Sequence, residues 1–232
     1  MHRDSSPSMS RKNLTPELQA EFLWRYQHGD KNQDPGRMFG IYHLLSQVIV
    51  YGVPGDVVEF GCNKGHTSVL LAKTLVSLGA QRDHALALYD SFQGMPAFTD
   101  RDAGTHPDLI VPGALKASPQ QVIDHFKARG CKECPKIHEG WFQDTIPRKL
   151  PEEIAFALLD GDLYESIHHC LRFVWRRMAP GGIVVIDDYG HPGIPGCKLA
   201  ADEFFADKQG AFFEQWGMCQ AFARKGWEAR HG

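Results

Sequence analysis

Two short apolar segments that each end in paired acidic residues restrict what this chain can fold into. Residues 154–159 and 183–186 have strand length, and residues 164–178 between them have the pattern of a helix closed by Pro180-Gly181-Gly182. Two strands joined by a crossover helix must run parallel. The acids that follow the two strands are Asp160, Asp162, Asp187 and Asp188. Because the carboxyl ends of parallel strands meet at one sheet edge, we expect these four side chains to lie close together.

Four carboxylates at the carboxyl edge of a parallel sheet predict a metal site. Their mutual repulsion is hard to sustain without a cation, and open α/β folds bind ligands at this edge. Oxygen ligands without histidine favour Mg²⁺, with Mn²⁺ or Ca²⁺ as substitutes. The alternative is that these acids cap helices, and Asp162 in particular could cap the helix that begins near Tyr164. Four acids at two adjacent strand ends favour the metal site.

Length and charge indicate one α/β domain with a small-molecule partner. A chain of 232 residues with 43% hydrophobic content can bury the core of such a domain. A net charge of -3 and a pI near 6.4 argue against nucleic-acid binding. The sequence has neither an apolar run that could span a membrane nor the apolar centre of a signal peptide, so we expect a cytoplasmic protein.

The 6 cysteines are scattered, as in a reduced intracellular enzyme. Cys131 and Cys134 have the spacing of half a zinc site or of a redox pair, but no second pair follows at a suitable spacing. We therefore interpret them as two thiols in a connecting turn.

The first 36 residues are predicted to form a polar tail and a helix outside the main domain, which spans residues 37–232. Thr15-Pro16-Glu17 combines a hydroxyl N-cap, a proline at the first helical position and an acid in the first turn. The apolar stripe of this helix consists of Leu14, Leu18, Phe22 and Tyr26. The helix either packs on the body of the protein or acts as a lid over the site, and a second amphipathic helix over residues 38–49 follows it.

A glycine-bearing turn follows the first predicted strand, residues 56–60. Gly61 and Gly65 lie between this strand and a helix over about residues 67–78, where the backbone can approach a nucleotide-like ligand closely. Glycines four apart, with Glu59 before the first, do not match the dinucleotide fingerprint G-x-G-x-x-G.

The second predicted strand, residues 85–89, ends in Asp90-Ser91. An acid at this position suits ribose hydroxyls. A helix cap or a turn is the alternative role for Asp90.

The rest of the chain completes an alternating pattern of strands and helices. The expected elements are a helix from Ser118-Pro119 to about Arg129, a strand over 136–139, a helix over 198–205 and a hairpin of 211–215 with 219–223. We therefore predict a Rossmann-like α/β fold with a seven-stranded, mostly parallel sheet, a C-terminal antiparallel hairpin and helices on both faces.

Two further segments are candidates for binding. Gly140 precedes Trp141 and Phe142, an aromatic pair that either packs a flat ring such as adenine or belongs to the core. The long loop that includes residues 99–116 is expected to shape the acceptor pocket. His168 and His169 are consecutive on a helix and face different directions, so we expect surface or packing roles for them.

These motifs resemble a known group of enzymes. Residues 59–65, Glu-Phe-Gly-Cys-Asn-Lys-Gly, together with Asp90 and the closing hairpin, resemble the class I S-adenosylmethionine-dependent methyltransferases. Residues 159–166, Leu-Asp-Gly-Asp-Leu-Tyr-Glu-Ser, and 180–190, Pro-Gly-Gly-Ile-Val-Val-Ile-Asp-Asp-Tyr-Gly, resemble the macrocin O-methyltransferase family of the TylF, MycF and NovP type, which acts on sugars of antibiotics. The resemblance covers roughly residues 37–205.

The resemblance implies magnesium-dependent transfer of a methyl group from S-adenosylmethionine to a sugar hydroxyl. It implies that Asp160, Asp187 and Asp188 hold the metal and that Asp162 is the general base. Cofactor binding is expected from Glu59, Gly61, Gly65, Ser68, Asp90, Ser91, Gly140, Trp141, Phe142 and Asp160. Substrate contacts are expected from Tyr164, Tyr189 and His191, and His191 is also a candidate for a secondary base.

The chemistry of the reaction agrees with these roles. A sugar hydroxyl is a poor nucleophile, so coordination that lowers its pKa and a carboxylate that takes its proton are both useful, and a vicinal diol is the natural acceptor. Three alternatives stay open: catechol methylation, which uses the same metal chemistry on a phenolic diol; a nucleotide-sugar-modifying or NAD-linked Rossmann enzyme; and a noncatalytic binding module. Homo-oligomer formation also stays open.

Overall fold

A single mixed sheet organises the protein, as a computed structural model describes it for residues 15–28, 35–208, 211–216 and 219–226. The strands are β1 (Asp56–Phe60), β2 (Leu86–Asp90), β3 (Lys136–Glu139), β4 (Ile154–Leu159), β5 (Met178–Ile186), β6 (Ala211–Trp216) and β7 (Gln220–Lys225). They form a 7-stranded sheet in the order β3-β2-β1-β4-β5-β7-β6. The first five strands pair in parallel, and β7 runs antiparallel to β5 and β6. The predicted fold class is confirmed.

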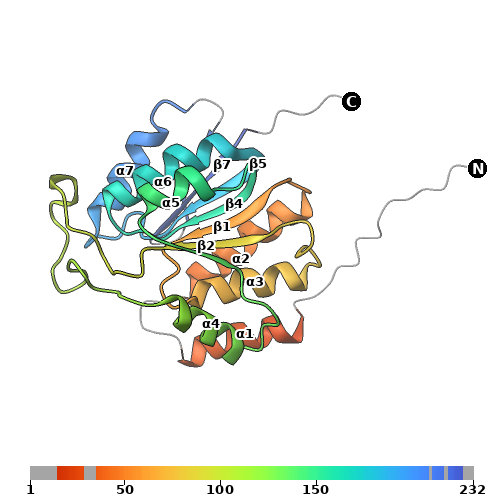
Figure 1. Ribbon diagram of the computed structural model, residues 1–232. Coiled ribbons are helices and arrows are strands. Elements are labelled where there is room, and N and C mark those ends of the chain that lie inside the picture. Colours follow the sequence, from red (N-terminus) through yellow and green to blue (C-terminus); the bar gives the residue numbers. More distant parts are fainter. Residues whose placement is uncertain (1–14, 29–34, 209–210, 217–218, 227–232) are drawn as a thin grey trace, which may run out of the picture.

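Helices cover both faces of the sheet (Figure 1). They are α1 (Pro16–His28), α2 (Pro35–Val50), α3 (His66–Ser77), α4 (Pro119–Ala128), α5 (Phe142–Lys149), α6 (Tyr164–Arg177) and α7 (Pro195–Phe205), with a short 3₁₀ helix η1 (Asp100–Asp102). Helices α5, α6 and α7 lie on one face, and α1 to α4 lie on the other. Each layer buries its own apolar cluster against the sheet.

The register of the central strands sets up the site. Strand β4 is buried along its whole length, as is usual for a strand with helices on both faces. Its last residue, Leu159, pairs with Phe60 of β1 on one side and with Ile186 of β5 on the other. These three strands therefore end at the same level, which brings Gly61, Asp160 and Asp187 together at one edge.

Strand β5 begins earlier than predicted. Residues 180–182 do not form a turn before the strand but interrupt its ladder with β4, because Ile154 pairs with Met178 and Phe156 pairs with Ile183. Gly181 has φ of 85°, and a Cβ at Gly182 would lie 2.6 Å from Met178 Sδ. The glycines permit this irregularity, and the predicted strand of residues 183–186 was only its second part.

Two helices also differ from the sequence prediction. Helix α5 was not predicted, because it is short and contains Pro147. Helix α7 begins at Pro195 rather than at Lys198, since proline is well tolerated in the first turn of a helix. The two strands of the C-terminal hairpin are confirmed, and the predicted turn at Gly217 lies outside the described residues.

Helix α1 packs on α2 and α3 through Leu18, which is buried, and Phe22, which is partly buried. The predicted stripe is wrong at Tyr26, whose exposed fraction is 76%. Instead, the buried carboxylate of Glu21 attaches α1 to its neighbours, since it accepts hydrogen bonds from Lys73 Nζ of α3 at 2.8 Å and from Arg129 Nη2 at the end of α4 at 2.9 Å. Residues 1–14 and 29–34, including Leu14, lie outside the described residues, and the lid role stays a prediction.

Two other expectations concern segments away from the sheet edge. Within the described residues, no helix combines the length and the apolar composition needed to cross a bilayer. Cys131 and Cys134 lie half-buried against the cluster of Val122 and Phe126, and burial raises the pKa of both thiols. This setting supports the interpretation that the two cysteines belong to a connecting segment.

Candidate active site

A cavity of about 910 Å³ opens at the carboxyl edge of the parallel strands. Most of the predicted site residues line it, namely Glu59, Gly61, Asp90, Ser91, Trp141, Phe142, Asp160, Asp162, Asp187, Asp188 and His191. They come from the ends of the five parallel strands β1 to β5 and from the segments that follow them. The topology therefore gathers residues that are far apart in sequence into one site, at the point where the strand order reverses.

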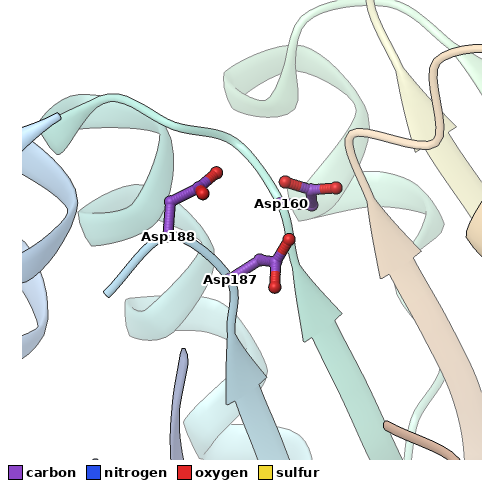
Figure 2. Close-up of side chains that lie close together, drawn as sticks. All are labelled: Asp160, Asp187 and Asp188. Carbon is purple, nitrogen blue, oxygen red and sulfur yellow. The ribbon is translucent and has the colours of Figure 1, made fainter. Parts of the chain in front are cut away.

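Three carboxylates converge from the ends of β4 and β5 (Figure 2). One oxygen each of Asp160, Asp187 and Asp188 lies within 4.8 Å of the others. The backbone holds the two strand ends together, since Asp187 N donates to Leu159 O at 2.9 Å. Within the described part of the chain, these three acids form the one group of three or more His, Cys, Asp or Glu side chains that are close enough to share a metal ion.

Burial and repulsion disfavour the charged forms of these acids. Burial, followed by repulsion from Asp187 and Asp188, raises the pKa of Asp160 well above its usual range. Burial and the neighbouring Asp188 likewise raise the pKa of Asp162 well above its usual range and that of Asp187 to about 6. A bound cation would therefore stabilise the charged forms of Asp160, Asp162 and Asp187. The all-oxygen donor set fits a hard divalent ion.

Arg37 is a site residue that the sequence analysis missed. Its guanidinium forms ion pairs with both Asp187 and Asp188. Nη2 donates a hydrogen bond to Asp188 Oδ1 at 2.7 Å, and Nε donates one to Asp187 Oδ1 at 3.1 Å. Burial alone would lower the pKa of Arg37. The attraction of the two carboxylates outweighs this effect, so the pKa of Arg37 is raised above its usual value. Gln220 of β7 also donates to Asp187, at 2.5 Å. The chain therefore supplies one positive charge to its own acidic cluster.

Asp162 lies beside this cluster and faces the cavity. The alternative role of capping α6 belongs to another residue, because the Tyr164 N–H donates to Asp102 Oδ1 at 2.8 Å. Asp162 and Asp188 both have positive φ, 57° and 56°, which is uncommon for residues other than glycine. Backbone strain of this kind persists where the surrounding structure holds it, often at active sites.

The glycine turn lies directly against Asp160. Gly61 has φ of 88°, and a Cβ there would lie 1.8 Å from Asp160 O, so only glycine fits. Gly65 does not line the cavity but begins α3, where a Cβ would lie 2.9 Å from Val122 Cγ1. The glycines thus bring the turn of residues 61–65 within reach of the acidic cluster.

Asp90 has the turn role that the sequence offered as one alternative, and its ribose-binding role stays a prediction. Its carboxylate accepts hydrogen bonds from Phe92 N at 2.7 Å and Asn63 N at 2.8 Å, which fixes the turn. Burial raises the pKa of Asp90. Each carboxylate oxygen has a second lone pair, so the side chain can still accept hydrogen bonds from a ligand in the cavity.

Trp141 and Phe142 both line the cavity at the start of α5. Phe142 also packs edge-on against Phe60, with ring centroids 5.7 Å apart, so the pair contributes to the core as well. His169 also lines the cavity, although a surface or packing role was predicted for it. Gly140 does not line the cavity but has φ of 134° just before this turn.

The structure does not bring Tyr164 and Tyr189 to the cavity. Their hydroxyls donate to acids of α7 instead, to Glu203 and Asp202, each at 2.6 Å. Both tyrosines are buried and connect the loops after β4 and β5 to α7. Among the three residues predicted to contact substrate, His191 is the one that lines the cavity.

Glu59 is 1% exposed and sits at the base of the glycine turn. It accepts a hydrogen bond from Ser68 Oγ, and Ser68 is buried behind it rather than at the cavity surface. Burial raises the pKa of Glu59 to about 7. The charged form of this carboxylate is therefore costly in the folded protein.

Replacing Glu59 by glutamine should stabilise the folded protein above neutral pH. The pKa of Glu59 is about 7 when folded and 4.5 ordinarily, so the folded state binds the proton more tightly. The wild-type free energy of unfolding therefore falls as pH rises between these two values. Glu59→Gln avoids this loss, and we expect it to be about 3 kcal/mol more stable than the wild type at about pH 8. Urea denaturation at about pH 5 and about pH 8 measures the difference.

The control for this prediction is Ser68→Ala. This variant removes the hydroxyl that donates to Glu59 and should destabilise the protein most above neutral pH. A stability difference between Glu59→Gln and the wild type that is the same at both pH values would contradict the assignment.

Comparison with known proteins places the chain in a family. Residues 34–211 match the family model of the macrocin-O-methyltransferases (TylF). The chain is 33% identical over 177 residues to the 8-demethyl-8-(2,3-dimethoxy-alpha-L-rhamnosyl)-tetracenomycin-C 4'-O-methyltransferase of Streptomyces olivaceus, covering 72% of this chain and 64% of that relative. It is 31% identical over 174 residues to the mycinamicin III 3''-O-methyltransferase of Micromonospora griseorubida, covering 72% and 67%.

A solved structure agrees with these relatives. The O-methyltransferase NovP superposes with a TM-score of 0.75 at 27% identity, covering 85% of this chain and 84% of that chain. The match spans less than two thirds of the length of the Streptomyces olivaceus relative, at 64%. The fold, the acidic strand ends and the matched family model agree, and the chain belongs to the macrocin O-methyltransferase family.

Proposed function

We propose that this protein is an S-adenosylmethionine-dependent, divalent-metal-assisted O-methyltransferase that acts on a sugar hydroxyl of a glycosylated small molecule. The observation that carries the proposal is the contact between Gly61 and the backbone of Asp160. It makes the glycine turn and the acidic cluster neighbours in one cavity. A cofactor held by the turn would therefore present its methyl group beside an acceptor held at the cluster.

The cofactor roles follow from the cavity lining. Asp90, oriented by two backbone N–H groups, is suited to accept hydrogen bonds from ribose hydroxyls. Trp141 and Phe142 offer aromatic faces to the adenine. Glu59 lies below the turn, where a carboxylate can hold the cationic end of the cofactor. Ser91 and the segment from Gly61 to Lys64 complete this side of the cavity.

Asp160, Asp187 and Asp188 would hold the metal ion, because their oxygens are close enough to share one ion. A bound divalent cation lowers the pKa of a hydroxyl that it coordinates. Asp162 is the proposed general base: it faces the cavity next to the cluster, and burial strengthens it as a base by raising its pKa. The positive charge of Arg37 acts against this rise in the pKa of Asp162, so Arg37 helps to keep Asp162 ionised.

The proposed acceptor class rests on the two relatives and on the cavity rim. The relatives are named for O-methylation of a rhamnosyl tetracenomycin and of mycinamicin III. Leu109 and Leu115 line the cavity and are 53% and 52% exposed. Among the described lining residues, the lysine and arginine side chains are Lys64, in the glycine turn, and Arg37, held by the acids. An apolar aglycone therefore fits this rim better than the diphosphate of a nucleotide sugar.

A panel of acceptors tests the proposal. Purified protein with S-adenosylmethionine and Mg²⁺ is incubated with a rhamnoside that carries an apolar aglycone, with a catechol and with a nucleotide-activated rhamnose. We expect a methylated product from the glycoside, detected by mass spectrometry, and little from the other two. Methylation of the catechol or of the nucleotide sugar alone would refute the acceptor class, and no S-adenosylmethionine binding in calorimetry would refute the function.

A further inference from the structure

A buried carboxylate outside the proposed chemistry, Asp102, connects the acceptor loop to the catalytic segments. It is 2% exposed, ends the short helix η1 and lies in the loop that was expected to shape the acceptor pocket. It also lines the cavity. None of the roles assigned above, in cofactor binding, metal binding or proton transfer, uses this residue.

Both oxygens of Asp102 accept hydrogen bonds. Oδ1 accepts from Tyr164 N at 2.8 Å, and Oδ2 accepts from Thr99 N at 3.0 Å and from Thr99 Oγ1 at 2.9 Å. The bond to Tyr164 satisfies the first amide of α6 and places a negative charge at the positive end of that helix. It spans 62 residues of sequence, so this cap ties a distant loop to the start of α6.

The space around Asp102 is closed by the start of α7. A Cβ at Gly196 would lie 2.3 Å from Asp102 Oδ1 and 3.0 Å from Tyr164 N. A second bond fastens the same loop nearby, since His106 N donates to Gly193 O at 3.0 Å. The acceptor loop is therefore attached to both segments that follow the acidic strand ends, the one after β4 and the one after β5.

Asp162 lies two residues before the amide that Asp102 caps. It has φ of 57°, and the tight turn around it is closed by Leu163 N donating to Gly161 O at 2.6 Å. A residue in this sparsely populated conformation keeps it only where neighbouring contacts hold it. The cap from Asp102 is such a contact, because it fixes the first residue of α6 directly after the turn.

We propose that Asp102 is a positioning residue that holds Asp162 in its working orientation and ties the acceptor loop to it. The proposal rests on the proposed function, because it assigns Asp102 a part in placing the base against the acceptor. Loosening the cap should misplace Asp162, which lowers kcat, and should loosen the loop, which raises KM. A small misplacement of a catalytic group is enough to cost roughly a hundredfold in rate.

The test compares Asp102→Ala with Asp100→Ala, a matched control that removes an exposed carboxylate from the same short helix. We expect Asp102→Ala to lower kcat/KM roughly 10- to 100-fold and to speed amide hydrogen exchange at Tyr164 and across residues 99–106. Asp100→Ala should change neither. In an Asp162→Asn background, Asp102→Ala should lower kcat by less than about twofold further, since it acts on kcat through Asp162.

The proposal would be overturned if the fold losses in kcat of Asp102→Ala and Asp162→Asn multiplied in the variant that carries both changes. Equal kinetics for Asp102→Ala and Asp100→Ala would also overturn it. Should Asp102→Ala fail to fold, Asp102→Asn serves in its place: its amide oxygen keeps an acceptor for Tyr164 N, while the backbone N–H of Thr99 loses its acceptor. This variant should raise KM and leave kcat nearly unchanged, and an unchanged KM would overturn the role of Asp102 in holding the loop. A wild-type protein that methylates no acceptor would refute the proposed function. In that case, unchanged exchange at Tyr164 in the variants would separately refute the fastening role of Asp102.

Discussion

Replacing Asp162 by asparagine is expected to lower kcat by about a hundredfold or more, the order of effect seen when a general base is lost. The amide keeps the size of the side chain and so preserves the turn at φ of 57°. It cannot accept the proton of an acceptor hydroxyl. Since Asp162 lies beside the three clustered carboxylates and is not one of them, metal and cofactor affinities should stay close to those of the wild type. Steady-state kinetics and calorimetry on one preparation separate the two effects.

The comparison that decides the role of Asp162 is with Asp187→Ala. A metal affinity that falls as far in Asp162→Asn as in Asp187→Ala would show that Asp162 is a metal ligand. Turnover within a few fold of the wild type would show that another group, such as His191 in the same cavity, takes the proton.

Replacing Asp187 by alanine is expected to weaken Mg²⁺ or Mn²⁺ binding by more than about a hundredfold. Loss of residues that only support metal ligands costs 10- to 100-fold, and loss of a ligand should exceed that. Asp187 is also the carboxylate that holds Arg37 and Gln220, so its removal disturbs both partners. Calorimetric titration of the metal into the purified protein measures the change directly.

Two variants calibrate this result. Gln220→Ala removes the amide that donates to Asp187 and should weaken metal binding by roughly tenfold, as a supporting residue does. Glu214→Gln, on the exposed part of β6, removes a carboxylate without touching the cluster and should leave affinity unchanged. Equal affinities for Asp187→Ala and Glu214→Gln would contradict a metal site at this edge.

The parts of the fold and site that the sequence predicted are those with local signals. A buried strand that is followed directly by an aspartate can be recognised from a stretch of a few residues. The pairing rules for parallel strands then place Asp160 and Asp187 at one edge of the sheet. The glycine turn is equally local, and the contact of Gly61 with Asp160 follows from the same strand order.

The residues that escaped prediction depend on contacts between distant segments. Arg37 reaches Asp187 across 150 residues of sequence, and Asp102 reaches Tyr164 across 62. Neither residue lies in a motif, so only the folded arrangement shows their roles. Local irregularity caused the other differences, as in β5, where the glycines allow a strand to continue through a segment that resembles a turn.

A crystal structure of the protein with S-adenosylhomocysteine and Mg²⁺ would show both the metal ligands and the place of the cofactor. We expect one ion bound by oxygens of Asp160, Asp187 and Asp188 at about 2.0–2.1 Å, with Asp162 outside its coordination sphere and the cofactor sulfur facing the ion across the cavity. An ion coordinated by Asp162, or a cofactor bound away from the turn of residues 61–65, would contradict this expectation.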